Sequence, residues 1–557
     1  MHKIIRVTPQ IILAIALTVL SSVVGVMIPL MIKQVIDTNG SLPVVSIVLT
    51  VVLFVAQTLL VTVGEFMMAK AGEQQVRDIR DQLTKHLLYV PKSFFDQQHS
   101  GDLASRVIND SNSIREFLTK NMASFVSGII TIVGSFAALL WLDWRLSLVL
   151  FVSLPVVVLL IIPVSNLAER YAKQTQDEIG TATNILIESF QSETHIKANT
   201  AENDVAVKAK HSFGKLFQVS VKSDLMESIS APIVLLFLFG AVALIFAYGG
   251  RRVAAGTLTV GTLMSFLIYL FQLLNPLGGL SSFFAGLAKM RGASAKISAL
   301  FAVAQEKQAG ITEVPEGDLS LDDVSFGYDG NSVLEDVDLQ IPQHKKIAIV
   351  GPSGGGKSTI INLIERLYTP KNGTIRLGNV NANEYGLREW RRNFGLVSQE
   401  NTIMQGTVRD NLLFGLSERY SEQQINEALT EAGLAEDIAN LPKGLDTEVG
   451  EQGVMLSGGQ RQRLQIAHVY LAEPAVIIFD EATANLDADS EFQVTSSLNK
   501  LLKNRTALIV AHRLSTVVDA DIIYFLENKH ITGVGTHKEL MESHAAYRRY
   551  VQEQIIN

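Results

Sequence analysis

The sequence predicts a membrane protein in two parts: an all-α transmembrane domain of six helices, then an α/β domain built around a phosphate-binding loop. Three observations predict this fold class. Apolar runs long enough to cross a bilayer lie in the first half of the 557 residues. After residue 318, short apolar strands alternate with helical patterns. Between one such strand and helix lies Gly351–Ser358, which has the GxxxxGKS pattern of a phosphate-binding loop.

Length and composition limit the classes of protein that remain. A chain of 557 residues is too long for one hydrophobic core, so we expect several domains. Hydrophobic residues make up 48% and charged residues 18%, an apolar balance for a soluble protein. A net charge of -8 gives no reason to invoke nucleic acid as a partner. The absence of cysteine excludes disulfides, thiolate metal sites and cysteine nucleophiles.

Apolar runs predict about six membrane spans. The first run is too long for the apolar part of a signal peptide and has no clear small-residue cleavage site, so we interpret it as a span. The predicted spans are Ile11–Ile32, Val44–Gly64, Ala123–Leu142, Leu146–Val164, Ala231–Tyr248 and Val260–Leu280.

The distribution of lysine and arginine orients these spans. The connections after the second and fourth spans are long and basic, whereas those after the first and third are short and carry few positive charges. The positive-inside rule therefore places the N-terminus and both long connections in the cytoplasm. Arg251 and Arg252, after the fifth span, go against the rule.

The long connections keep a helical pattern as they become polar, over Glu73–Tyr89 and Tyr171–Gln191. We therefore expect the spans to continue as helices, and some 25 extra residues would reach roughly 40 Å beyond the bilayer. Two short polar breaks, Asn109–Ser113 and Thr200–Asp204, are candidate contacts with a soluble domain. The polar stretch from Ala302 to Asp318 is interpreted as a linker. The expected domains are a transmembrane domain (1–301), the linker (302–318) and an ATP-binding domain (319–557).

Glu65 stands out because it lies at the cytoplasmic end of the second predicted span. An ionisable residue at membrane depth is a hypothesis of function, here contact with a substrate. The alternatives are that Glu65 extends to the membrane surface or pairs with Lys70.

The phosphate-binding loop combines glycines with a helix N-terminus. Glycine lets backbone N–H groups turn toward phosphate oxygens, and the positive end of the following helix adds to that field. Lys357 is expected to reach the terminal phosphates, and the Ser358 hydroxyl to hold Mg²⁺. The expected nucleotide-binding residues here are Gly351, Pro352, Ser353, Gly354, Gly355, Gly356, Lys357, Ser358 and Thr359.

Two further segments fit nucleotide chemistry. The apolar strand Ala475–Phe479 is followed by Asp480, a candidate Mg²⁺ anchor through water, and by Glu481, a candidate base for the attacking water. The alternative is an acid pair exposed at a strand end. Ser457–Gln460 precedes the helical pattern of Arg461–Leu471, and its serine and glycines predict a second anion site.

With these motifs in place, the sequence resembles an ATP-binding cassette (ABC) exporter half-transporter, and in particular the bacterial homodimeric multidrug exporters. The resemblance rests on the phosphate-binding loop, on Leu456–Gln460 and on Asp480-Glu481. In the membrane half, Pro91–Asp96 followed by Gly101, Asp102 and Arg106 matches the exporter pattern before the first coupling helix. The resemblance to this family covers nearly the whole chain.

The resemblance assigns roles to residues whose local context is not specific. It implies that Tyr328 stacks on adenine, that Gln399 contacts Mg²⁺ and senses the γ-phosphate, and that His512 contacts the γ-phosphate. Thr447–Glu451 resembles the exporter loop that faces the coupling helices. Asp487 matches the loop between two ATP sites, although this chain has Ala484-Asn485 where the family commonly has Ser-Ala.

The resemblance also implies a mechanism. In this family two ATPase domains enclose two ATP molecules, and each site joins the phosphate-binding loop of one chain to Ser457, Gly458, Gly459 and Gln460 of the other. ATP and Mg²⁺ are the implied cofactors, and a second copy of the chain is the implied partner, because all the site motifs are intact. ATP favours the closed dimer, and the cytoplasmic loops transmit closure to the spans.

The expected function is ATP-driven export of amphipathic or hydrophobic small molecules across the cytoplasmic membrane. Export of a lipid, a lipid-linked intermediate or a peptide is the alternative within the same class. A soluble ATPase acting on nucleic acid or ribosomes lacks six apolar spans, and a nucleotide-gated channel fits poorly with an intact Glu481. An importer subunit is disfavoured because importers usually keep the two parts on separate chains.

Overall fold

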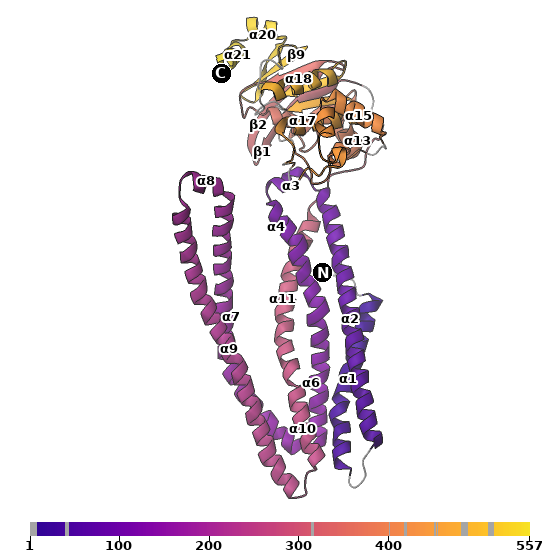
Figure 1. Cartoon of the computed structure of the whole chain (residues 1–557), viewed down its shortest axis with the longest axis vertical. Coiled ribbons are helices and arrows are strands. Elements are labelled where there is room, and N and C mark those ends of the chain that lie inside the picture. The colour runs from indigo at the N-terminus through magenta and orange to yellow at the C-terminus, as the bar shows by residue number, and fades with distance from the viewer. Residues whose placement is uncertain are drawn as a thin grey trace. The chain divides into compact units, whose positions relative to one another are not determined.

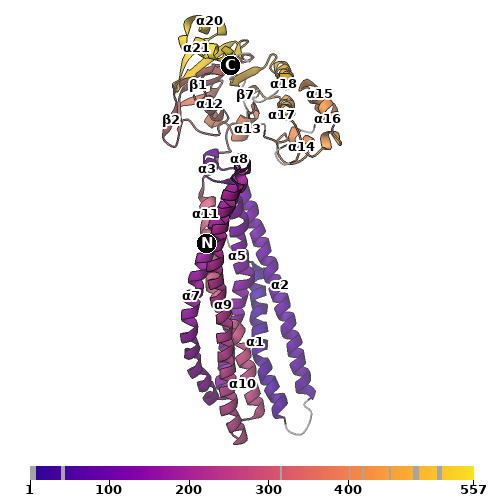
Figure 2. The same cartoon turned by 60° about the vertical axis from the view of Figure 1, so that its left-hand side comes forward.

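The computed structural model describes residues 8–38, 44–313, 317–399, 402–416, 420–450, 453, 455–480, 488–510 and 517–556. These form two compact units. One consists of residues 1–85 and 103–302, and the other of residues 86–102 and 303–557. The first is helical and the second is built on β-sheets covered by helices (Figure 1 and Figure 2), in agreement with the predicted fold class.

Helices make up the first unit, and only the last residues of α2 and the first of α4 belong to the second. They are α1 (Pro9–Asp37), α2 (Val44–Leu88), α4 (Ser100–Ser105), α5 (Ser111–Glu116), α6 (Met122–Leu142), α7 (Trp144–Gln191), α8 (Glu193–Ala198), α9 (Glu202–Ala254), α10 (Val260–Gln272) and α11 (Leu274–Ala302). Two π-helical segments join α4, α5 and α6 into one helix from Ser100 to Leu142. Within the described residues, α1, α2 and this composite helix are long and apolar enough to cross a membrane.

The sixth predicted span, Val260–Leu280, is divided at Leu273 into α10 and α11. Pro276 follows three residues later, and it has no N–H to donate to the carbonyl of Gln272 four positions back. The proline therefore accounts for the interruption at this place in an otherwise continuous apolar run.

Helix packing in this unit is fixed by polar contacts as well as by apolar area. α1 packs against α6 and α10, and α11 packs against α6. The buried Tyr269 hydroxyl of α10 donates to the Val26 carbonyl over 2.6 Å, and the Ser265 hydroxyl donates to the Pro29 carbonyl over 2.7 Å. Because Pro29 and Val26 lie inside α1, these bonds tie α10 to one face of that helix. α7 and α9 run side by side as a long hairpin closed by α8 (Figure 1).

The predicted helical extensions are confirmed, since α2 continues to Leu88 and α7 to Gln191. Thr200 has a left-handed φ of 52° in the turn between α8 and α9, so the second predicted break is also present. The first is wrong: Asn109–Ser113 lies inside the continuous Ser100–Leu142 helix. Its polar groups meet the guanidinium of Arg80, whose Nε donates to the Ser111 hydroxyl over 2.9 Å.

In the second unit, two sheets share the core. The antiparallel sheet has the order β2-β1-β4-β5, with β1 (Leu319–Tyr328), β2 (Asn331–Ile341), β4 (Asn372–Leu377) and β5 (Val380–Asn381). The larger sheet has the order β10-β9-β3-β8-β7-β6, and it is parallel apart from β10. Its strands are β10 (His530–Gly535), β9 (Ile522–Glu527), β3 (Lys346–Val350), β8 (Thr506–Val510), β7 (Val476–Asp480) and β6 (Phe394–Val397).

The helices of this unit cover both faces of the larger sheet. They are α3 (Lys92–Asp96), α12 (Lys357–Ile364), α13 (Leu387–Arg392), α14 (Val408–Leu412), α15 (Glu422–Glu431), α16 (Ala435–Ala439), α17 (Gly458–Ala472), α18 (Ala488–Leu501), α20 (His537–Ser543) and α21 (Ala545–Ile556). Successive side chains of a strand point to opposite faces. In β3, Ile347 and Ile349 pack with α12 and the antiparallel sheet, whereas Ala348 and Val350 pack with the core of α14, α15, α17 and α18.

The stretch predicted to be a linker lies against this unit where the structure describes it. The backbone N–H of Glu306 donates to the Tyr89 carbonyl over 2.8 Å, and that of Ile311 donates to the Glu384 carbonyl over 2.8 Å. The guanidinium of Arg391 donates two hydrogen bonds, of 2.7 and 3.2 Å, to the Glu306 carboxylate. Residues 303–313 are therefore held by hydrogen bonds at several points.

Candidate nucleotide site

The phosphate-binding loop runs from the end of β3 to the start of α12, as predicted. Gly354 and Gly356 adopt left-handed φ values of 77° and 101°. A Cβ at Gly351 would lie 2.1 Å from the Leu526 carbonyl oxygen, so the close approach of β9 requires glycine there. The sequence therefore supplies glycine where the backbone must turn or come close, and the loop ends at the N-terminus of α12.

Lys357 is folded back over this loop. Its ammonium donates to the carbonyl oxygens of Gly351 and Pro352, each over 2.9 Å, and its side chain is buried. The ammonium of Lys357 therefore lies at the turn of the loop backbone. Beside Gly354 this turn faces open space. This donor set of backbone N–H groups, helix N-terminus and ammonium fits a polyphosphate.

Two other predicted residues emerge at the same edge of the sheet. β6 and β7 pair in parallel with Val397 opposite Phe479, so Gln399 comes just after the carboxyl end of β6 and Asp480 ends the neighbouring β7. β8 lies between β3 and β7, which brings the loop after β3 and Asp480 to this shared edge. Parallel strands end together at one edge, where open α/β sheets bind their ligands. An amide, a carboxylate and the Ser358 hydroxyl are oxygen ligands that suit Mg²⁺.

Three predicted site residues lie outside the described residues: Glu481, Asp487 and His512. Their positions along the chain are still informative. Glu481 directly follows Asp480 at the end of β7, and His512 comes two residues after β8 ends at Val510. Both therefore stay predictions attached to strand ends of the candidate site.

Tyr328 ends β1 next to the helix of the phosphate-binding loop. Its ring meets those of Phe326 and Tyr368 edge-on, with centroids 4.9 and 5.2 Å apart, and its hydroxyl lies 3.4 Å from that of Thr359 in α12. The side chain is half-buried. The structure thus brings Tyr328 to α12, the neighbourhood that a base-stacking ring requires.

The second predicted anion site begins α17. Ser457 caps this helix: the backbone N–H of Gln460 donates to the Ser457 hydroxyl over 3.2 Å, and the Gln460 side-chain oxygen accepts from the Ser457 N–H over 2.9 Å. The Gln460 amide also donates to Asp437 over 2.8 Å. Ser457 itself is exposed, so the start of α17 is open to a ligand while Gln460 is held by its neighbours.

The helices that follow the two predicted phosphate-binding segments, α12 and α17, pack on opposite faces of the large sheet. Ile360 and Ile364 of α12 belong to the core shared with the antiparallel sheet, whereas Leu464 and Ala467 of α17 belong to the core on the other face. A six-stranded sheet therefore separates the two helices within one chain. The fold places Tyr328 beside α12, and Gln399 and Asp480 at the sheet edge where the loop of Lys357 begins, whereas the helix that Ser457 caps packs on the other face.

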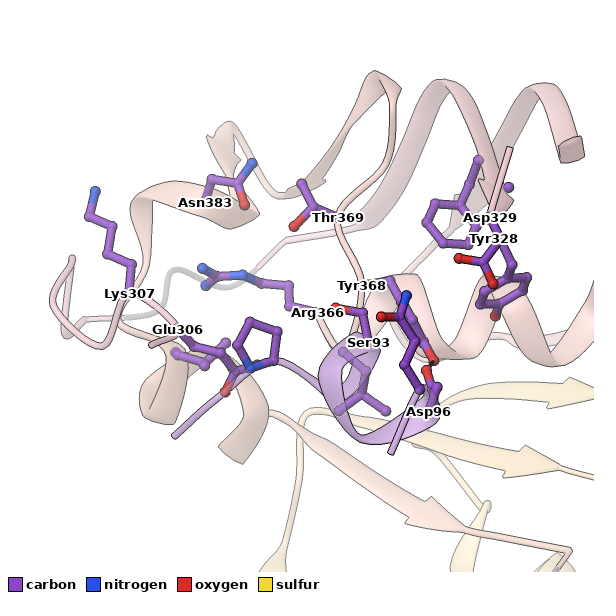
Figure 3. Close-up of a pocket in the computed structure, with 16 residues that line it drawn as sticks. Ser93, Asp96, Glu306, Lys307, Tyr328, Asp329, Arg366, Tyr368, Thr369 and Asn383 are labelled. Atoms are coloured by element: carbon purple, nitrogen blue, oxygen red, sulfur yellow. Dashed lines mark hydrogen bonds between the residues drawn. The ribbon is translucent and has the colours of Figure 1, made fainter. Parts of the chain in front are cut away.

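A cavity of about 650 Å³ in the second unit reveals residues that sequence reasoning missed. It lies between α3, the start of the predicted linker and the segment after α12 (Figure 3). Tyr328 lines it, as do Asp96 of α3 and Tyr368. The Tyr368 hydroxyl donates to the Asp96 carboxylate in a short hydrogen bond, and the Lys92 ammonium lies 5.9 Å from the centroid of the Tyr368 ring.

The Asp96–Tyr368 hydrogen bond shifts the pKa of both partners. Partial burial acts to raise the pKa of Asp96, but the hydrogen bonds from Tyr368 and Lys92 outweigh it and hold that pKa below its usual range. Burial and the same hydrogen bond raise the pKa of Tyr368. The Pro91–Asp96 motif marked this segment in the sequence, but its pairing with Tyr368 depends on tertiary packing and had no local signal.

This fold and site define a membrane protein with a P-loop ATPase domain on the same chain. The chain belongs to the ABC transporter family. The family described as "ABC transporter transmembrane region" matches residues 11–277, and the one described as "ABC transporter" matches residues 334–484. The protein is an ABC exporter that hydrolyses ATP, with a helical membrane region before its nucleotide-binding domain.

The names of two of its relatives describe two activities, multidrug resistance and flipping of lipid A-core. A "multidrug resistance ABC transporter ATP-binding and permease protein" of Lactococcus lactis subsp. lactis is 33% identical over 99% of this chain and 95% of its own length. An "ATP-dependent lipid A-core flippase" of Haemophilus influenzae is 33% identical over 87% of this chain and 84% of its own. The solved structure of a bacterial Atm1-family ABC exporter with ATP bound has a TM-score of 0.79 and 25% identity, and the match covers 98% of each chain.

Proposed function

We propose that two copies of this chain form an exporter that moves amphipathic, hydrophobic small molecules across the cytoplasmic membrane, driven by ATP hydrolysis. The observation that carries this proposal is the likeness to the multidrug resistance protein of Lactococcus lactis over nearly the full length of both chains. In this proposal residues 1–301 form the transmembrane domain, 302–318 the linker and 319–557 the ATPase domain. The basic long connections support a cytoplasmic N-terminus and ATPase domain.

Each residue of the candidate site has a role in this proposal. Gly351–Thr359 hold the phosphates of ATP, and Tyr328 stacks on its adenine. Ser358, Gln399 and Asp480 are the residues that would hold Mg²⁺, which neutralises phosphate charge when bound. Glu481 orients and deprotonates the attacking water, His512 contacts the γ-phosphate, and Asp487 lies between the two sites.

A homodimer is supported by two features of the described chain. First, a sheet separates the phosphate-binding loop from Ser457, so a site using both draws them from two chains. Second, the distal parts of α7 and α9 expose large apolar side chains that are predicted to lie outside the bilayer. Phe190 is 73% exposed and Phe217 68% exposed. Exposed aromatic surface of this kind marks a face that a partner covers.

Coupling follows from differential binding. ATP contacts both the phosphate-binding loop of one chain and Ser457 of the other only when the ATPase domains are together, so its binding energy favours that state. Hydrolysis removes this preference and allows the domains to separate. We propose that α3, held on the ATPase side by the Asp96–Tyr368 bond, is one of the segments that carry this movement to the membrane helices.

Export of a lipid is the second candidate, and the lipid A-core flippases among the relatives favour it. The two candidates differ in the charge and size of the cargo. A cationic dye, a neutral dye and a fluorescent phospholipid can therefore be compared in one assay.

The test is ATP-dependent transport by the purified protein in liposomes, with Glu481→Gln as the inactive control. Uptake of dyes by wild type but not by the control is the expected result. Movement of the phospholipid alone would replace drug export by lipid export. If neither dyes nor phospholipid move while ATP is hydrolysed, the proposed substrate class is wrong.

A further inference from the structure

The helical unit contains a cavity of about 290 Å³ between α1, α2, α6 and α11. Thr18 and Ser127 lie inside the first and third predicted spans, so the cavity belongs to the membrane-embedded part of the chain. Its lining combines one carboxylate with five hydroxyl groups: Glu65, Thr18, Ser21, Ser124, Ser127 and Ser282. Such a polar set at membrane depth requires an explanation.

Three of the five hydroxyl groups of this cavity already donate a hydrogen bond to a backbone carbonyl of their own helix. Thr18 donates to the Ala14 carbonyl over 2.9 Å, Ser21 to the Thr18 carbonyl over 2.8 Å, and Ser282 to the Gly279 carbonyl over 2.9 Å. A hydroxyl that donates to its own helix keeps only lone pairs for a ligand. The cavity therefore offers mainly hydrogen-bond acceptors, three hydroxyl oxygens and the Glu65 carboxylate, which suit a ligand that brings a positive charge or donors.

The carboxylate strengthens this polarity. Glu65 makes no ion pair or hydrogen bond with any residue that the structure describes, which leaves the sequence-based alternative of pairing with Lys70 without a contact to support it. Among the lining residues that the structure describes, none is a lysine, arginine or histidine. A carboxylate at membrane depth is costly unless a cation balances it. The remaining lining includes Val61, Ala123 and Pro276, which suit hydrocarbon rather than water.

We propose that this cavity binds the ammonium head group of an exported cationic amphiphile. Glu65 balances its positive charge, and the hydroxyl oxygens of Thr18, Ser21 and Ser282 surround it. The volume is at the small end of drug-sized pockets, so the cavity holds the head group while the apolar body lies along neighbouring helices. A phosphate head group would meet the like charge of Glu65 and three hydroxyls that already donate elsewhere, with only Ser124 and Ser127 left to donate, which disfavours it. This inference rests on the proposed export function and narrows its substrate class.

The test measures binding of two probes that differ only in charge. Both carry a dansyl group on an alkyl chain, and one ends in trimethylammonium whereas the other ends in the neutral, isosteric tert-butyl group. Full-length protein in lipid nanodiscs is titrated with each, and empty nanodiscs give the background. Glu65→Gln should weaken binding of the cationic probe about tenfold and leave the neutral probe unchanged, as expected for losing one charge-assisted contact.

Two variants control for structural damage. Glu65→Asp keeps the charge and should retain the preference for the cationic probe. Glu73→Gln removes a carboxylate from the same helix, α2, away from the cavity lining, and should bind both probes as wild type does. Equal binding of the cationic probe by wild type and Glu65→Gln would overturn the proposal. An equal loss for both probes would also overturn it, since Glu65 would then be supporting the helices.

The place where the probe binds is tested with a single introduced cysteine, because the natural chain has none. Ser124 lines the cavity and is exposed, so Ser124→Cys can be labelled with a maleimide. The cationic probe should slow labelling at least severalfold at concentrations where the neutral probe does not. Labelling that neither probe slows would place the cation elsewhere. These binding results are independent of transport, so they separate failure of this site from failure of the export function.

Discussion

The guanidinium Nη1 of Arg252, at the end of α9, lies 2.6 Å from the Asp143 carboxylate Oδ2, and both side chains are largely buried, 15% and 12% exposed. The other carboxylate oxygen of Asp143 accepts from the backbone N–H of Leu146 over 2.9 Å and so caps α7. One aspartate therefore fixes the start of α7 and balances a charge on α9. In the orientation predicted from the sequence, Arg252 goes against the positive-inside rule, and this ion pair supplies its counter-charge.

Asp143→Asn should lower the thermal stability of the protein. Asparagine can still cap α7, but it leaves the largely buried Arg252 without a counter-charge, a loss of about 1–3 kcal/mol for a buried group that loses its partner. The measurement is the unfolding midpoint in detergent. Arg252→Gln and the double variant complete a cycle, and additive effects in the double variant would show that the two residues do not interact.

Tyr368→Phe should uncouple transport from ATP hydrolysis. It removes the bond to Asp96, which contributes about 1 kcal/mol, while keeping the ring packed against Tyr328. We expect an unchanged KM for ATP and a reduced stimulation of ATPase activity by transported compounds, with Asp96→Asn behaving alike. A changed KM with normal stimulation would assign Tyr368 to nucleotide binding instead.

Glu365→Gln should change how stability depends on pH. Burial raises the pKa of Glu365 to about 7, with the nearby Asp480 adding to the shift against the opposing charge of Arg391. The native carboxyl thus keeps its proton between pH 4.5 and about 7, where the unfolded chain has lost it. Since the native state binds more protons there, the free energy of unfolding falls as pH rises through this window.

The Gln variant lacks this slope. At pH 8 it should therefore be more stable than wild type, by up to about 3 kcal/mol, and near pH 4.5 the two should differ little. Thermal unfolding of the nucleotide-binding part, followed at several pH values, gives the comparison. Parallel pH profiles for the two proteins would show that Glu365 titrates normally.

Tyr328→Ala should weaken ATP binding, because stacking of a base on an aromatic ring contributes roughly 1–3 kcal/mol. We expect a KM for ATP at least fivefold higher with a small effect on kcat, and near-normal values for Tyr328→Trp. If the Ala and wild-type proteins have the same KM, Tyr328 is a packing residue only.

Cysteines at Ser353 and Gly458 should join two chains in the presence of ATP. The motivation is that α12 and α17 lie on opposite faces of one sheet, so their N-termini meet only between chains. A dimeric band on a non-reducing gel is the expected result, and no native cysteine interferes. Each single-cysteine variant serves as the control. A bond formed only within one chain would rule out shared sites.

Local sequence determined the features whose chemistry is local. The phosphate-binding loop follows from glycines at Gly354 and Gly356, where φ is positive, and the start of α17 follows from the cap formed by Ser457 and Gln460. Helical extensions could be predicted because apolar periodicity persists through α2 and α7. In each case the residues that carry the signal lie within a few turns of one another.

Contacts between distant segments could not be predicted in the same way. Asn109–Ser113 looked like a break because it is polar, but Arg80 from α2 satisfies it inside a helix. Asp96 and Tyr368 are 272 residues apart and meet only because α3 packs on the ATPase side. Glu65 was visible as a charge near a predicted span, yet only packing of four helices gives it a cavity and hydroxyl neighbours. Sequence determined which groups were available, and tertiary packing decided which of them face each other.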